Sequence, residues 1–161
     1  MNMLILDDGQ KIVSALVENS IGTDSLLVPN DYWNRLNSQE RKDLRKKLPI
    51  LLRKYSKRIA SMERLYHKAG KIKYNRGVGK MKKFSIRVNT GVWANLGVLA
   101  AAHGVSRCYL FNYMLWLEEL GGKEDFFVKT LNRGVPSFHW TYKMTWKINR
   151  RQNLISRELQ F

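Results

Sequence analysis

A run of alternating polar and apolar residues occupies positions 82–88, with the sequence KKFSIRV. Because successive side chains of a strand point to opposite faces, a period of two predicts a β-strand with one buried face. The apolar residues Phe84, Ile86 and Val88 would share that face. The opposite, solvent-facing side of the strand would carry Lys83, Ser85 and Arg87.

Two helices are predicted to follow this strand. The first can be capped by Asn89 or Thr90 and would end before Gly104, which suits the left-handed position that closes a helix. The second can be capped by Ser106 and would continue to Leu120. The first helix is apolar almost all round, which predicts that neighbouring segments cover it on every side.

The segment before the strand is predicted to be helical and strongly basic. Asn30 and Ser38 can cap two short helices, and Pro49 suits the first turn of a longer one. In that longer helix, apolar residues recur at three- and four-residue steps between positions 48 and 66. Its other face carries the basic residues Arg53, Lys54, Lys57, Arg58 and Arg64.

The C-terminal region is predicted to contain a β-hairpin. A brief helical segment around 126–131 leads to residues 138–148, where aromatic or apolar residues alternate with polar ones. A polar turn at 149–153 separates this stretch from a second alternating stretch at 155–161. We therefore expect two antiparallel strands at this end of the chain.

Together these patterns predict an α+β protein with a strand–helix–helix core, an N-terminal basic helical region and a C-terminal β-hairpin. We find no internal repeat in the sequence. The expected segments are a short α/β element at 1–29, the basic helical region at 30–70, a basic linker at 71–81, the strand–helix–helix domain at 82–121, and a helix with the aromatic hairpin at 122–161.

The basic residues are concentrated in one third of the chain. The protein has a formal net charge of +16 and a pI near 10.2. The stretch from Arg35 to Arg87 holds 19 Lys or Arg residues and 3 acidic residues, so it accounts for the whole excess. A charge of this size indicates a polyanionic partner, with nucleic acid ahead of an anionic membrane surface.

No pattern of catalytic or metal-binding residues is present. The three histidines, His67, His103 and His139, show no ligand spacing to Cys108 or to paired carboxylates. We therefore expect no enzymatic activity, no metal and no other cofactor. A single cysteine excludes an intramolecular disulfide and suits the reducing cytoplasm.

The sequence also argues against secretion and against insertion in a membrane. The first ten residues lack the basic and apolar regions of a signal peptide, because Asp7 and Asp8 end the opening apolar stretch. The apolar region from Val92 to Leu117 is divided by residues 103–107. Each part spans only roughly 10 to 14 residues, which is typical of buried core helices. We expect a cytoplasmic protein associated with the nucleoid.

A single short strand is marginally stable, but two copies paired antiparallel form a ribbon narrow enough for the major groove of DNA. In such a homodimer Lys83, Ser85 and Arg87 would face the base edges, where Arg and Lys suit the acceptors of guanine. The start of the second helix offers backbone N–H groups and a positive dipole end to a phosphate. The residues at this helix start are Val105, Ser106 and Arg107.

Residues 82–120, KKFSIRVNTGVWANLGVLAAAHGVSRCYLFNYMLWLEEL, resemble the ribbon-helix-helix domain of the Arc and MetJ class of repressors, which bind DNA through a β-ribbon. The resemblance implies a homodimeric transcriptional regulator that binds double-stranded DNA. It implies base contacts by the outward strand residues and phosphate contacts at the second helix, to which we add Lys80 and Lys82. The whole chain also resembles an uncharacterised family of spirochaete proteins.

Three other functions are consistent with parts of the sequence. The basic helices and the aromatic hairpin could bind RNA or single strands without sequence preference, in which case Trp140 and Trp146 would stack on bases. An antitoxin would bind its own operator through the ribbon and a partner protein through another segment. Binding to a membrane surface through the basic stretch ranks last, because that stretch, apart from Leu51 to Tyr66, lacks the face of Trp, Phe and Leu combined with Lys that interfacial helices use.

Overall fold

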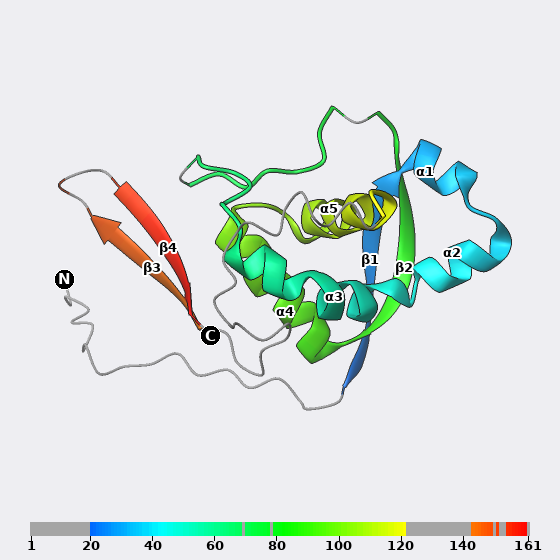
Figure 1. Ribbon diagram of the computed structural model, residues 1–161, viewed down its shortest axis with the longest axis horizontal. Coiled ribbons are helices and arrows are strands. Elements are labelled where there is room, and N and C mark those ends of the chain that lie inside the picture. Colours follow the sequence, from blue (N-terminus) through cyan, green and yellow to red (C-terminus); the bar gives the residue numbers. More distant parts are fainter. Residues whose placement is uncertain are drawn as a thin grey trace, which may run out of the picture.

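The structure, a computed structural model, describes residues 20–68, 70–77, 79–121, 143–149, 151 and 154–160. Its ordered core starts from two strands, β1 (Ile21–Pro29) and β2 (Met81–Asn89). They pair antiparallel along all nine residues of each and form the β1–β2 ribbon (Figure 1). The mixed α+β fold that the sequence predicts is therefore confirmed.

Each strand of the ribbon is followed by helices. After β1 come α1 (Asn30–Arg35), α2 (Ser38–Leu44) and α3 (Lys47–Ser61). After β2 come α4 (Thr90–His103) and α5 (Arg107–Glu119). The second unit is thus a strand and two helices, as predicted, and the first unit has the same order with its first helix broken between α1 and α2.

The two units correspond to each other at a constant offset of 60 residues. The strands begin at 21 and 81, the helices after them at 30 and 90, and the last helices at 47 and 107. Four residues are identical at this offset: Ser25 and Ser85, Val28 and Val88, Trp33 and Trp93, and Leu36 and Leu96. The expectation of no internal repeat is therefore wrong. The repeat was missed because four identical residues are too few to reveal it without the backbone.

The pairing of the ribbon also corrects the sequence analysis. We expected β2 to pair with the same strand of a second molecule, whereas it pairs with β1 of its own chain. The physical reason is that β1 is tethered to β2. Closing the intervening loop costs an entropy that grows only slowly with its length, and the tether gives β1 a high effective concentration at β2.

One face of the ribbon packs into the hydrophobic core. Leu26 and Val28 of β1 are fully buried, and Phe84, Ile86 and Val88 of β2 are at most 5% exposed. Phe84 joins both units, because its ring lies 5.6 Å from that of Trp33 in α1 and 6.2 Å from that of Phe111 in α5. The buried positions predicted for the strand are Phe84, Ile86 and Val88, and all three are confirmed.

Helix α4 is covered on nearly all sides, as its apolar sequence predicts. Of its fourteen residues only Gly91 is exposed. It packs against α3, α5, β2 and β4. The strand β4 adds a polar contact, because the guanidinium of Arg157 donates to the carbonyl oxygen of Ala101 at 2.9 Å. The helix is therefore a buried central element, which explains why it lacks a polar face.

The ends of the helices agree with the sequence in part. Asn89 caps α4 and Ser106 caps α5, as predicted, and Gly104 adopts φ +68° at the end of α4. Asn37, and not Ser38, caps α2, because a reciprocal pair of hydrogen bonds joins Asn37 and Glu40. Helix α1 begins at Asn30 itself, with Pro29 in the capping position.

The predicted C-terminal hairpin is confirmed by β3 (Lys143–Asn149) and β4 (Leu154–Gln160), which pair antiparallel. Figure 1 shows this hairpin at the opposite end of the molecule from the β1–β2 ribbon. The helical segment expected at 126–131, the first residues of the expected strand at 138–142, and most of the α/β element expected at 1–29 lie outside the described residues.

A buried histidine connects the ends of α3 and α4. His103 is 4% exposed; its Nε2 lies 2.6 Å from the carbonyl oxygen of Ile59, and its Nδ1 accepts a hydrogen bond from the N–H of Leu65 at 3.3 Å. These bonds require a neutral ring with the proton on Nε2. Helix α3 ends at Ser61, earlier than the apolar pattern predicts, and the chain after it bonds to this histidine.

This environment predicts a loss of stability in mild acid. Burial lowers the pKa of His103 below its ordinary value of 6.5; the hydrogen bond that the ring donates to the Ile59 carbonyl oxygen opposes this shift, and the charge of Arg64 adds to it. The neutral ring therefore stabilises the fold fully above pH 6.5, and this contribution falls as the pH drops toward the folded pKa, by at most about 1.4 kcal/mol per pH unit. We would measure the free energy of unfolding in denaturant between about pH 7.5 and about pH 5, a range that brackets the ordinary pKa of histidine. This free energy should depend less on pH in His103→Gln than in the unchanged protein.

The matched control is His67→Gln, because His67 is exposed. This variant should keep the pH dependence of the unchanged protein. An equal effect of the two substitutions would contradict the role of His103.

Candidate nucleic-acid interface

The second face of the ribbon points away from the core. Lys83, Ser85 and Arg87 are all exposed on it, as predicted. The register places Leu27 opposite Lys83, Ser25 opposite Ser85, and Thr23 opposite Arg87. Residues directly opposite in an antiparallel pair share a face. The outward face therefore consists of six residues: Thr23, Ser25, Leu27, Lys83, Ser85 and Arg87.

Three of these six residues come from β1 and were missed by the sequence analysis. Thr23 is exposed, and Ser25 and Leu27 are half-buried. Strand β1 gives a weak pattern, because only Leu26 and Val28 of its nine residues are buried. The available signal is the 60-residue correspondence, which repeats a serine, an apolar residue and a valine at the same spacing in both strands.

The outward face is positively charged on one strand only. Lys83 and Arg87 belong to β2, and among the described residues no carboxylate pairs with either of them. Strand β1 contains no Lys or Arg and carries the exposed Asp24. The carboxylate of Asp24 accepts a hydrogen bond from the N–H of Ser25 at 2.7 Å. The two strands therefore present different chemistry on a regular backbone.

The start of α5 lies beside β1. The side-chain amide of Asn112 donates to the carbonyl oxygen of Leu27 at 2.8 Å, which fixes the helix against the free edge of the strand. Both elements line a groove of about 530 Å³, together with α4 and the linker. Its lining includes Ser25 and Leu27 of β1 together with Val105, Ser106 and Arg107 at the start of α5. The groove thus brings the predicted phosphate-contacting segment next to Ser25 and Leu27 of β1, whereas the predicted base-facing residues Lys83, Ser85 and Arg87 do not line it.

The predicted phosphate site at Val105, Ser106 and Arg107 needs a correction. Val105 is buried and its N–H donates to the carbonyl oxygen of Ala100 at 3.0 Å, while the N–H of Ser106 donates to that of Lys73 at 2.9 Å. Two of the amides that were expected to be free are therefore used within the protein. The end of α4 occupies the N–H of Val105, and the linker occupies the N–H of Ser106 through the carbonyl oxygen of Lys73.

Of the three residues of this predicted phosphate site, Arg107 is the one with an exposed side chain. It is exposed, and its guanidinium lies 5.1 Å from the centre of the Trp93 ring, with its Nε 3.4 Å from the Trp93 carbonyl oxygen. Lys80 and Lys82, the other two predicted phosphate contacts, are exposed at the start of β2. The carbonyl oxygen of Lys80 accepts from the N–H of Asn30, which ties this end of β2 to α1.

The basic face predicted for the long helix is only partly available. Arg53 is exposed, whereas Lys57 and Arg58 are half-buried. Arg64 lies beyond the end of α3, half-buried, with its Nη2 and Nε out of solvent. It does not share the surface of the other four residues, because α3 ends before it. Lys54 is taken up by an interaction with α5.

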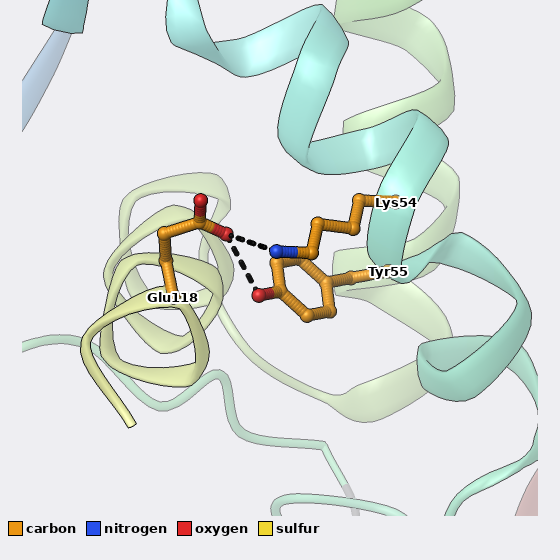
Figure 2. Close-up of polar contacts among 3 residues, drawn as sticks. All are labelled: Lys54, Tyr55 and Glu118. Atoms are coloured by element: carbon orange, nitrogen blue, oxygen red, sulfur yellow. Dashed lines mark hydrogen bonds and ion pairs between the residues drawn. The ribbon is translucent and has the colours of Figure 1, made fainter. Parts of the chain in front are cut away.

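Lys54 and Tyr55 hold a carboxylate of α5 (Figure 2). One carboxylate oxygen of Glu118 accepts from Lys54 Nζ at 3.0 Å and from the Tyr55 hydroxyl at 2.7 Å. The hydroxyl of Tyr55, with a smaller effect of Lys54, lowers the pKa of Glu118 below its ordinary value. This arrangement joins α3 and α5, the last helices of the two units. Because Lys54 is paired with the carboxylate of Glu118, we assign it a structural role.

Other classes of site are not found in the described part of the chain. There, no three His, Cys, Asp or Glu side chains lie close enough together to hold a metal ion. None of the described helices has the length and apolar character needed to cross a bilayer. Burial raises the pKa of the half-buried Cys108 thiol, which fits packing better than reactivity.

The fold and its surface define a basic α+β protein with an exposed two-stranded ribbon flanked by helices. The chain belongs to the family described as "Protein of unknown function (DUF1564)", whose model matches residues 1–161. This agrees with the expected resemblance to an uncharacterised family. No curated protein and no solved structure matches the sequence.

The contact between Tyr55 and Glu118 can be tested by removing one hydroxyl. Tyr55→Phe should lower the free energy of unfolding by about 1 kcal/mol, because a hydrogen bond to a partly exposed carboxylate is lost. The folded pKa of Glu118 is lowered, so its contribution is present above the ordinary value of 4.5 and is lost as the pH falls. The difference between the two proteins in urea unfolding should therefore shrink in acid.

The control for this prediction is Tyr74→Phe, since Tyr74 is 52% exposed in the linker. It should change the free energy of unfolding by less than about 0.5 kcal/mol. A Tyr55→Phe protein as stable as this control at neutral pH would show that the contact contributes nothing.

Proposed function

We propose that the protein binds double-stranded DNA by inserting the β1–β2 ribbon into the major groove and that it regulates transcription. In this proposal the chain forms a ribbon-helix-helix arrangement by itself, with one strand and the following helices from each unit. The observation that carries the proposal is the exposed outward face of the ribbon, where Lys83, Ser85 and Arg87 alternate with buried core residues.

The dimensions of the ribbon suit the groove. Two paired strands lie about 4.8 Å apart, and a major groove about 12 Å wide admits such a ribbon with its side chains. The buried face anchors the ribbon in the core, because Leu26 and Val28 are fully buried and Ile86 is 2% exposed. The outward side chains are therefore held on a regular backbone and do not need to be ordered on binding.

The chemistry of the face suits base recognition. Arg87 and Lys83 can donate to the O6 and N7 acceptors of guanine, and Ser85 is a small donor or acceptor. Flanking cations would contact phosphates. The first residues of the two last helices, Lys47 and Arg107, occupy corresponding positions 60 residues apart and are both basic. Phosphate contacts on both sides would fix the depth of the ribbon in the groove.

A second candidate function is sequence-independent binding of single strands, and the observation that favours it is Trp146, which is 49% exposed on β3. An exposed ring can stack on a base. However, the guanidinium of Arg157 lies 3.9 Å from the centre of that ring and occupies one of its faces. We therefore favour the ribbon, whose residues Lys83, Ser85 and Arg87 are all exposed.

The role of the ribbon predicts a sequence-dependent effect of Arg87→Ala. Selection from random duplexes at near-physiological salt first identifies the preferred site. Arg87→Ala should weaken binding to that site by about 1 to 3 kcal/mol, because a base contact is lost, and should weaken binding to a scrambled duplex much less. Fluorescence anisotropy on both duplexes measures the difference.

Lys143→Ala serves as the control, because it removes one exposed positive charge from the hairpin at the other end of the molecule. It should leave discrimination between the two duplexes unchanged. If Arg87→Ala reduced affinity for both duplexes equally, base recognition by the ribbon would be excluded. If only Trp146→Ala reduced binding, the second candidate function would be supported.

Arg107→Ala should behave differently from Arg87→Ala. Loss of a phosphate contact lowers affinity for preferred and scrambled duplexes alike, since the phosphate backbone carries no sequence. The slope of log K against log salt should become less negative by about 0.9. A change in sequence preference with an unchanged slope would contradict a phosphate contact at Arg107.

A further inference from the structure

The two strands of the ribbon are equivalent in backbone but not in side chains. The register pairs Ser25 with Ser85 at the middle of the ribbon, and these two residues also correspond at the 60-residue offset. The strand pairing is therefore symmetric about this point. On either side of it the corresponding residues differ, because Thr23 corresponds to Lys83 and Leu27 corresponds to Arg87.

We propose that one chain recognises a non-palindromic site in duplex DNA, which rests on the proposed function of the ribbon. Two identical strands related by a two-fold axis present the same residues to both halves of a site, and this favours a palindrome. Here the symmetric pairing is kept while the chemistry of the two halves differs. The preferred sequence must therefore differ between the halves.

The expected difference follows from the residue pairs. At one end of the ribbon Lys83 lies opposite Leu27, and at the other end Arg87 lies opposite Thr23. Lys and Arg suit guanine, whereas an apolar side chain suits the methyl group of thymine. Because β1 has no cationic residue, the guanine contacts fall to β2, and β1 contributes apolar and hydroxyl contacts.

One chain is also sufficient to complete the ribbon. All nine residues of β1 are paired with β2, so the ribbon is complete without a strand from a second copy. Contacts between the units hold the arrangement. Tyr55 and Lys54 of the first unit bind Glu118 of the second, and His103 of the second unit bonds to Ile59 of the first. The binding unit is therefore the monomer.

The test makes the two strands chemically equal. The double variant Thr23→Lys/Leu27→Arg gives β1 the residues of β2 at all three outward positions. Selection from random duplexes should yield a non-palindromic motif for the unchanged protein and a palindromic motif for this variant. The variant should prefer its own motif over the original one by roughly tenfold or more, since one base contact is worth about 1 to 3 kcal/mol.

Native mass spectrometry of each protein on its selected duplex gives the stoichiometry, which should be one chain per site. A control variant, Asn34→Lys/Gln39→Arg, adds the same two charges at exposed positions of α1 and α2. It should retain the original motif. Thermal unfolding of both variants checks that they are folded.

The outcomes separate this inference from the proposed function. A palindromic motif for the unchanged protein, bound by two chains, would overturn the inference and leave duplex recognition intact. An unchanged motif in the folded Thr23→Lys/Leu27→Arg variant would also overturn it, because β1 would then not contact the bases. No enriched duplex for any of the proteins would overturn the proposed function itself.

Discussion

The antiparallel pairing of β1 with β2 is the constraint on which the rest of the structure depends. Two strands alone are marginally stable, so the ribbon persists only because one of its faces is buried under helices of both units. Phe84 illustrates this, since its ring lies against Trp33 of the first unit and Phe111 of the second. The other face is exposed along β2 and half-buried at Ser25 and Leu27 of β1, and its side chains are positioned by a backbone that the core holds in place.

The two units are joined by contacts of different kinds. In the core they share apolar residues, and at the ends of the helices they share polar ones. Glu118 is held by Lys54 and Tyr55, and buried His103 bonds to the chain on either side of the end of α3. Because these polar groups fix direction as well as distance, they set how α3 lies against α4 and α5.

The linker between the units has a role beyond connection. Lys73 forms a bridge with Val105 and occupies the N–H of Ser106 at the start of α5. This removes one backbone donor that a phosphate could use and leaves the exposed guanidinium of Arg107 at this place. The fold thus decides which basic side chains are available on the surface. Lys54 forms an ion pair with Glu118, whereas Lys83 and Arg87 are exposed.

The sequence by itself determined the local features. Period-two alternation identified β2 and the orientation of Lys83, Ser85 and Arg87, and capping residues identified α4 and α5, because these signals depend only on neighbours in the chain. Only the tertiary structure showed that β1 is the partner of β2, that the chain repeats at 60 residues and that Thr23 and Leu27 share the outward face. Strand pairing joins residues far apart in sequence, and two buried residues in β1 leave too weak a pattern to reveal it.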